Sequence, residues 1–455
     1  MAALASSTRW RGVADGFSAS GYFRLAERNG VFWLVDPDGG RFLSKGVNTV
    51  RLDQDRVQNS DRIPYAEACR REYDDQDSWR AAVARRLARW GFNTLGAWSD
   101  EAVASAGAVP LATTPLLDLG MSYTWRNGGQ TPEPTQEFPD VFDPAFERHV
   151  RGRSRDLCGR RQQAQNILGW FVDNELCWGP DWRGGDELLT LFLNLGAHAP
   201  GRRAALNWLQ VRHRDFNACN SVWRSSARSW DEFENLPRLA QPYRRKPIYQ
   251  RTAADEDAAN RANPNRAVFA ADCEAFSALV VERYFALTTT AVKAADPNHL
   301  LLGCRFAYVP SHEMIELAGR YNDVISFNCY DRDATAVIEA YAAAGRPCLI
   351  GEFSFRGVDS GLPNSNGAGP LVATQAERAA GFRHYVTAAL HARNLVGYHW
   401  FEHADQPRAG RFDGENSNFG TVTIDDLVYE QLTQAMTSLN GEAEHLHAAA
   451  DSATR

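Results

Sequence analysis

The stretch Ile167-Leu-Gly-Trp-Phe-Val-Asp-Asn-Glu175 is a short apolar run that ends in three polar residues. Two later stretches have the same character, Cys348-Leu-Ile-Gly-Glu-Phe353 and Leu395-Val-Gly-Tyr-His-Trp-Phe401. Short apolar runs of this kind are typical of buried strands in a parallel sheet. We therefore expect an α/β protein whose strands end in polar side chains.

Similar apolar runs recur along the chain, and segments with helical apolar spacing separate most of them. The predicted strands are Arg41–Val47, Gly91–Gly96, Val109–Leu119, Ile167–Val172, His299–Cys304, Val324–Tyr330, Cys348–Phe353 and Leu395–Phe401. The predicted helices cover about 78–90, 143–165, 267–295, 335–344, 373–393 and 427–440. Strands that alternate with helices imply a parallel sheet, and eight of them suggest a closed (β/α)₈ TIM barrel. An open doubly wound sheet is the alternative, but Gly-x-Gly-x-x-Gly does not follow the first strand.

The two ends of this pattern define the expected domain organisation. Tyr22–Glu27 and Val31–Val35 flank Asn29-Gly30, which is a strong signal for a β-hairpin. We expect residues 1–40 to form a short N-terminal β-meander packed on the barrel, and 41–445 to form the barrel. Residues 177–265 are less regular, so we expect an insertion after strand four that forms part of the cleft.

Composition narrows the classes of function. The 455 residues are 44% hydrophobic and 23% charged, so the chain can bury a sizeable core. The net charge is −7 without a basic stripe, so we expect no nucleic-acid partner. There is no run of 18 apolar residues, and we expect no membrane span. The first residues contain no apolar signal region, which favours a cytoplasmic protein, or a secreted one whose signal has been removed.

The cysteines and histidines do not indicate a metal site. The eight Cys residues include no Cys-x-x-Cys pair, so separate buried thiols are expected in place of disulfides or zinc ligands. His399 and His403 are four residues apart at the end of a predicted strand, where this spacing does not bring them to one face of a helix. We expect no metal and no cofactor.

Most of the predicted strands end in polar or aromatic residues. In a barrel the carboxyl ends of all strands face one mouth, where active sites form. The residues expected there are Asn48, Trp98, Asn174, Glu175, Arg305, Asn328, Tyr330, Glu352, His399, Trp400 and Glu402. All of them except Glu175 and Glu352 are predicted to bind the substrate. Any one of the aromatic residues could instead belong to the core, and Arg305 could simply brace neighbouring loops.

Two of these residues, Glu175 and Glu352, are carboxylates on opposite strands. Such a pair can cleave a glycosidic bond, because one acid protonates the leaving oxygen while the other carboxylate attacks the anomeric carbon. Retention needs a separation of about 5–5.5 Å, and opposite positions on a small barrel suit that distance. A lone Glu after a strand is usually a rim charge, but the pair favours catalysis. We expect Tyr330 or Arg305 to stabilise ionised Glu352, and Asn174 to contact a sugar hydroxyl.

Three longer stretches resemble the family 50 β-agarases, within clan A of the glycoside hydrolases. They are Phe32–Gly39 with Ser44–Asn48, then Gly169–Leu176, and finally Gly397–Phe401 with Asp405–Pro407 and Gly410–Asn416. The resemblance extends from about residue 20 to 440. It implies a barrel that cleaves β-1,4 bonds of agarose at galactose, often in exo fashion and without a cofactor.

The resemblance also implies individual roles. It makes Glu175 the acid/base and Glu352 the nucleophile, with Tyr330 holding the nucleophile and Trp400 forming the floor of a sugar subsite. This chain departs from the family where Glu402 replaces an expected Gln, and we find neither the usual extra N-terminal domain nor an export signal. Another β-glycosidase, acting on β-galactosides or β-glucosides, and a non-catalytic glycan-binding barrel are the alternatives. The oligomeric state stays open.

Overall fold

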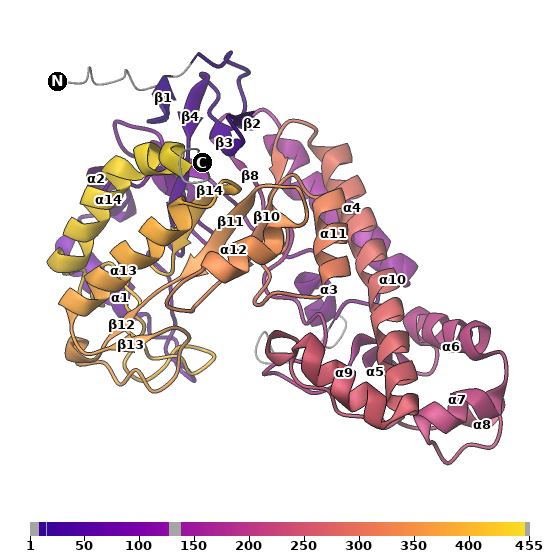
Figure 1. Cartoon of the computed structure of the whole chain (residues 1–455). Coiled ribbons are helices and arrows are strands. Elements are labelled where there is room, and N and C mark those ends of the chain that lie inside the picture. The colour runs from indigo at the N-terminus through magenta and orange to yellow at the C-terminus, as the bar shows by residue number, and fades with distance from the viewer. Residues whose placement is uncertain (1–8, 15, 127–137, 451–455) are drawn as a thin grey trace.

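The parallel strands form the centre of the molecule (Figure 1). The structure is a computed structural model that describes residues 9–14, 16–126 and 138–450. The parallel strands found there are β5 (Ser44–Val47), β6 (Thr94–Leu95), β7 (Ala112–Thr113), β8 (Gly169–Trp170), β9 (Leu300–Leu301), β10 (Ile325–Asn328), β11 (Cys348–Phe353) and β14 (Leu395–Trp400). All their residues are buried, as expected of strands covered on both faces. The chain is thus an α/β protein with a parallel sheet.

Six of these strands form one sheet in the order β10-β11-β14-β5-β6-β7, and β8 pairs with β9 in a second sheet. Isolated parallel bridges join the two sheets on both sides. Thr113 and Leu116, at the end of β7, pair with Ile167 and Phe171 around β8. Phe306, after β9, pairs with Phe327 in β10. Each edge of the larger sheet is therefore linked to the smaller one.

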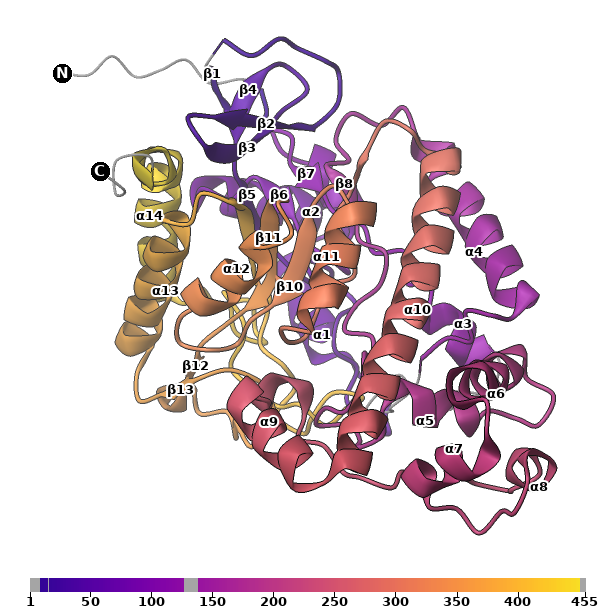
Figure 2. The same ribbon diagram turned by 45° about the vertical axis from the view of Figure 1, so that its right-hand side comes forward.

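Helices cover the outside of the strands (Figure 2). Those of the part described are α1 (Pro64–Glu72), α2 (Gln76–Arg89), α3 (Met121–Arg126), α4 (Pro144–Leu157), α5 (Leu188–Leu193), α6 (Pro200–His213), α7 (Phe216–Trp223), α8 (Trp230–Glu234), α9 (Ala253–Ala262), α10 (Pro264–Ala295), α11 (His312–Tyr321), α12 (Thr335–Ala342), α13 (Gln375–Leu390) and α14 (Glu430–Ala448). Side-chain caps fix several starts: the Asp143 carboxylate accepts from the amide of Ala145 at α4, and Asn263 accepts from Arg266 at α10. None of the described helices is long and apolar enough to cross a membrane.

Figures 1 and 2 show different elements at the two ends of the parallel strands. The antiparallel sheet of β1 (Val13–Ala14), β2 (Arg24–Arg28), β3 (Val31–Val35) and β4 (Gly40–Phe42) lies at the amino ends of the parallel strands. Helices α5 to α9 lie at the opposite end, together with the short strands β12 (Arg356–Gly357) and β13 (Leu371–Val372). Because β12 follows β11 directly, that end holds the carboxyl ends of the strands.

Some elements differ from the prediction. The expected strand Arg41–Val47 is divided, because β4 pairs with the antiparallel sheet while β5 pairs with β14 and β6. Helices α1, α9 and α11 were not predicted. They are only nine or ten residues long, so their apolar periodicity is short. The eight cysteines are all buried and free, which confirms the prediction of separate thiols.

Candidate active site

Glu175 and Glu352 both lie at the carboxyl ends of parallel strands. Glu175 follows β8, and its backbone amide donates to the carbonyl oxygen of Arg305 at 3.1 Å. Glu352 belongs to β11 and is only 5% exposed. The Asn328 end of β10 pairs with Glu352, and Arg305, which follows β9, also reaches it.

Two donors hold the Glu352 carboxylate. The Tyr330 hydroxyl donates to Oε2 at 2.5 Å, and the Arg305 guanidinium Nη2 donates to Oε1 at 2.5 Å. Burial and the adjacent carboxylate raise the pKa of Tyr330 well above its ordinary value, so the phenol keeps its proton. Charge-assisted bonds to separate oxygens fix the plane of the Glu352 carboxylate and compensate its negative charge.

Arg305 is completely buried beneath the mouth. Its guanidinium lies 4.9 Å from the ring centroid of Trp98 and 4.8 Å from that of Phe171. Besides Glu352, it donates from Nε to the side-chain oxygen of Asn174 at 2.8 Å. The prediction that Arg305 contacts the sugar is therefore wrong, because the side chain is inaccessible and instead orients two neighbouring residues.

Amide side chains link the two carboxylates. Asn328 Nδ2 donates to Glu175 Oε1 at 2.7 Å and lies 3.3 Å from the side-chain oxygen of Asn174. Because Asn174 also accepts from Arg305, a continuous polar chain runs from Glu175 to Glu352. A move of either carboxylate would disturb the bonds of the other.

Trp98, Asn174, Glu175 and Tyr330 are the predicted residues that stay partly exposed around these bonds. Asn328 is almost buried, at 3% exposure. Counting the buried Glu352 and Arg305, the structure thus brings together seven of the predicted residues, and it leaves the other four, Asn48, His399, Trp400 and Glu402, deeper.

Asn48 is one of those deeper residues. Its side-chain amide donates to the backbone oxygens of Gly351 at 2.9 Å and Trp400 at 3.2 Å. Its oxygen accepts from the amide of Ala97 at 2.9 Å, and the residue is fully buried. The predicted sugar contact of Asn48 is therefore wrong, and the side chain ties β5 to its neighbours.

His399 and Trp400 are also fully buried. His399 Nε2 lies 2.8 Å from the Ser44 hydroxyl, and burial lowers the histidine pKa to about 3. Trp400 points the other way and packs against Phe382 and the Arg378 guanidinium of α13. The two side chains point in opposite directions because successive side chains of a strand face opposite sides. Both are fully buried, so neither reaches the mouth, and the predicted subsite floor at Trp400 is wrong.

The next residue, Phe401, is the aromatic side chain that lies beside the site. Its ring centroid is 6.3 Å from that of Tyr330 and 6.4 Å from that of Trp98. The family resemblance pointed to the tryptophan, whereas strand alternation counted along β14 would have selected Phe401.

Asp118 is a second residue that we did not predict. It follows β7, is partly exposed, and lies near enough to Arg305 for their charges to interact. Burial of its surroundings raises the Asp118 pKa to about 6, while Arg153 and Arg305 oppose this shift. A polar residue at the end of the predicted strand Val109–Leu119 was the available signal.

Glu402 is fully buried, so its predicted contact with sugar is also wrong. Burial raises the pKa of Glu402 well above its ordinary value, and the nearby Asp55 carboxylate raises it further. Arg411 is the opposing cation, and its guanidinium also pairs with Asp413 and Glu415 at 2.9 and 2.7 Å. One cation shared by so many carboxylates disfavours the ionised form of Glu402.

We expect Glu402→Gln to remove a pH-dependent loss of stability. Folded Glu402 keeps a proton that the unfolded chain releases above the ordinary glutamate pKa, so its contribution to stability declines as pH rises. The melting temperature of the variant should therefore fall less than that of the parent between pH 5 and 8. Exposed Glu442→Gln in α14 is the control. Parallel curves for parent and Glu402→Gln would show that Glu402 is ionised in the folded state.

Five residues that follow successive strands have a left-handed backbone. They are Thr49, Trp98, Asp118, Glu175 and Arg305, with φ between 48° and 59°. Such a conformation costs roughly 1–2 kcal/mol for a residue other than glycine. Strained backbone of this kind tends to gather where side chains must be aimed at a ligand.

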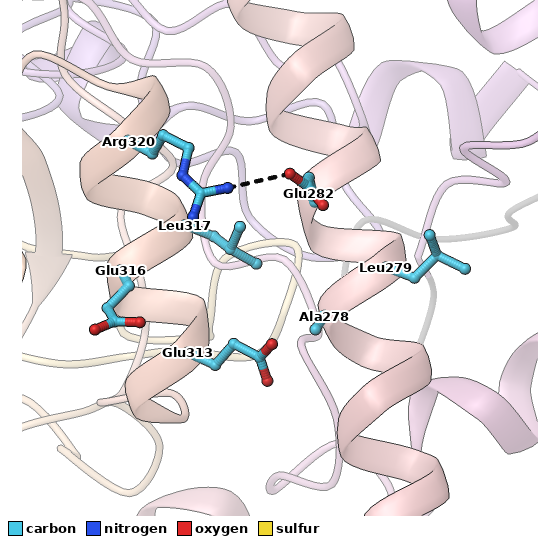
Figure 3. A pocket seen from close by; sticks show the side chains of 7 residues that line it. All are labelled: Ala278, Leu279, Glu282, Glu313, Glu316, Leu317 and Arg320. Atoms are coloured by element: carbon cyan, nitrogen blue, oxygen red, sulfur yellow. Dashed lines mark hydrogen bonds and ion pairs between the residues drawn. The ribbon is translucent and has the colours of Figure 1, made fainter.

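Two other features were considered as sites, a surface cavity and a possible metal-binding group. A surface cavity of about 310 Å³ lies between α10 and α11, where Glu282 pairs with Arg320 at 3.2 Å (Figure 3). It includes none of the predicted site residues. Within residues 9–14, 16–126 and 138–450, no group of three His, Cys, Asp or Glu side chains is arranged to hold a metal ion.

Sequence comparison places the chain beside two agarases, although no family model matches it. Beta-agarase A of Vibrio sp. (strain JT0107) is 28% identical over 91% of this chain and 45% of its own length. Beta-agarase B of the same organism is 26% identical over 94% of this chain and 49% of its own length. The chain therefore spans about half the length of these relatives.

Comparison of structures agrees. A solved exo-β-agarase superposes with a TM-score of 0.77 at 22% identity, covering 97% of this chain and 68% of that one. This likeness concerns the fold. Along nearly its whole length, the chain is thus similar in sequence to β-agarases, and it shares the fold of a family 50 agarase.

Proposed function

We propose that this chain is a retaining glycoside hydrolase that cleaves β-galactosidic bonds, with agarose-type oligosaccharides as substrates and an exo mode of attack. The observation that carries the proposal is the Glu352 carboxylate, held by Tyr330 and Arg305 and linked through Asn174 and Asn328 to Glu175. The named agarases support the substrate class.

In the first step, a Glu352 oxygen attacks the anomeric carbon as the bond to the leaving oxygen breaks. Glu175 gives its proton to that oxygen, and a covalent glycosyl-enzyme forms. Tyr330 and Arg305 hold the attacking carboxylate in place, so little reorganisation is needed as its charge is transferred to the new bond.

In the second step, Glu175 takes a proton from water. The water oxygen bonds to the anomeric carbon, and Glu352 leaves as a carboxylate. Two inversions give net retention. Asn328 donates to Glu175 in the structure, and this bond orients the group that serves first as acid and then as base.

The fold assigned to this mechanism is a closed (β/α)₈ barrel. The parallel bridges on both sides of the β8–β9 pair support closure, because they leave neither edge of the six-stranded sheet unlinked. Residues 41–445 would form this barrel and residues 1–40 a β-segment packed on its amino end. Residues 177–265, which contain α5 to α9, would form part of the cleft.

The test is the stereochemistry and range of hydrolysis. Purified protein should release sugar from neoagaro-oligosaccharides faster than from aryl β-glucosides, and proton NMR should show the β-anomer forming first. An α-anomer formed first would contradict retention. Faster hydrolysis of aryl β-glucosides would favour another β-glycosidase, and sugar binding without any hydrolysis would favour a non-catalytic barrel.

A further inference from the structure

Three aromatic rings gather beside the proposed acid/base. Trp182 follows β8 and is 52% exposed, and Tyr249, in the short helix η3 (Ile248–Gln250), is 45% exposed. Tyr308, after β9, is nearly buried at 7%. Its ring centroid lies 6.2 Å from that of Trp182 and 5.8 Å from that of Tyr249. The exposed rings of Trp182 and Tyr249 thus both pack against the nearly buried ring of Tyr308.

Hydrogen bonds from neighbouring segments hold Tyr308 and the short helix η3 in place. The amide of Trp178 donates to the Tyr308 hydroxyl at 3.2 Å, and the Tyr341 hydroxyl donates to the Tyr308 carbonyl oxygen at 3.1 Å. The amide of Ile248 donates to the carbonyl oxygen of Pro180 at 2.9 Å, which joins η3 to the segment after β8. Exposed aromatic surface is therefore maintained on an ordered support.

Arg183 connects the rings to Glu175. Its guanidinium lies 4.6 Å from the Trp182 ring centroid and donates to the Glu175 carbonyl oxygen at 2.6 Å. It also pairs with buried Asp181 at 2.6 Å, and its own side chain is only 5% exposed. A single side chain, that of Arg183, thus connects the Trp182 ring to Glu175. The connection leads to the proposed acid/base and not to the proposed nucleophile.

We propose that Trp182 and Tyr249 form the stacking platform for the sugar ring on the leaving-group side of the scissile bond. This inference rests on the proposed function, because Glu175 marks that side only if it protonates the leaving oxygen. A pyranose ring presents apolar C–H faces, and exposed aromatic rings supply a matching apolar surface. A contact made to a remote part of the substrate can be used to accelerate the reaction.

The experiment compares two substrates of the full chain. For neoagarohexaose, Trp182→Ala or Tyr249→Ala should lower kcat/KM by about 10-fold to 100-fold, the usual effect of losing an aromatic anchor. For neoagarobiosyl β-fluoride, whose leaving group is a fluoride ion, the same variants should stay within about twofold of the parent. Trp182→Phe should keep most of the activity on the hexaose, because a ring remains.

Tyr22→Ala is the matched control, since Tyr22 precedes β2 and its hydroxyl donates to Gln163. The antiparallel sheet to which β2 belongs lies at the other end of the strands. Equal losses on both substrates would overturn the platform, because they would indicate a disturbed Glu175. If the parent hydrolyses neither substrate, the proposed function fails, and calorimetry of neoagarohexaose binding then decides the platform separately. Weaker binding by Trp182→Ala would support an aromatic sugar site, and unchanged binding would exclude one.

Discussion

Glu352→Ala is expected to lose at least about 10³-fold in kcat on neoagaro-oligosaccharides, because it removes the group that we propose forms the covalent intermediate. Its two donors, Tyr330 and Arg305, would remain in place and leave a small polar space. Azide should enter this space, attack the anomeric carbon directly and release the α-glycosyl azide. Initial rates with and without azide, followed by NMR of the product, measure both effects.

Glu352→Gln separates chemistry from folding in this experiment. It keeps the size of the side chain. Its amide oxygen can still accept from Arg305, and its amide nitrogen can donate to the Tyr330 hydroxyl oxygen, so its melting temperature should stay near that of the parent. Its activity should nevertheless be lost, because an amide is a poor nucleophile. Turnover comparable to the parent in either variant would refute Glu352 as nucleophile.

Glu175→Ala is expected to lose as much on substrates with a sugar leaving group, because the leaving oxygen would no longer receive a proton. On neoagarobiosyl β-fluoride the loss in kcat/KM, which reports the first step, should be far smaller, since fluoride departs without protonation. On this substrate kcat should stay low without azide, because Glu175 is also the base of the second step. Azide should restore turnover by attacking the glycosyl-enzyme, and the product should be the β-glycosyl azide. Kinetics on both substrates and NMR of the azide product provide the measurement.

Asn328→Ala is an informative companion variant. It removes the bond to Glu175 Oε1 but leaves the acid itself, so its loss should be smaller than that of Glu175→Ala. If azide gave the α-product with Glu175→Ala, the roles of the two glutamates would have to be exchanged.

The sequence predicted the parallel strands well where their apolar runs were long. The predicted bounds of the Cys348–Phe353 strand match β11. They were less accurate for β6 and β7, which have only two residues each, because short strands carry little pattern. In the insertion 177–265, α7 and α9 were not predicted, since they are short and pack on neighbouring helices through contacts that no local periodicity records.

At the site, residue type identified the partners of Glu352 but not the depth of each side chain. Tyr330 and Arg305 were named as possible donors, and both contact Glu352. Asn48 and His399 were wrongly predicted to bind substrate, because the sequence places them at strand ends but does not say how deeply each side chain is buried. Trp400 and Phe401 show the same limit. A shift of one residue along a strand turns a side chain to the opposite face, so the neighbour of the predicted residue is the one that lies beside the site.

The left-handed residues at the strand ends have a consequence for the way this protein can evolve. Glycine would adopt the backbone of Thr49, Trp98, Asp118, Glu175 or Arg305 at a lower cost. It would also delete the side chain that the strain serves to aim. A laboratory selection for heat resistance should therefore enrich glycine at the partly exposed Glu175 and extinguish turnover, whereas a selection for growth on the substrate should reject the same change.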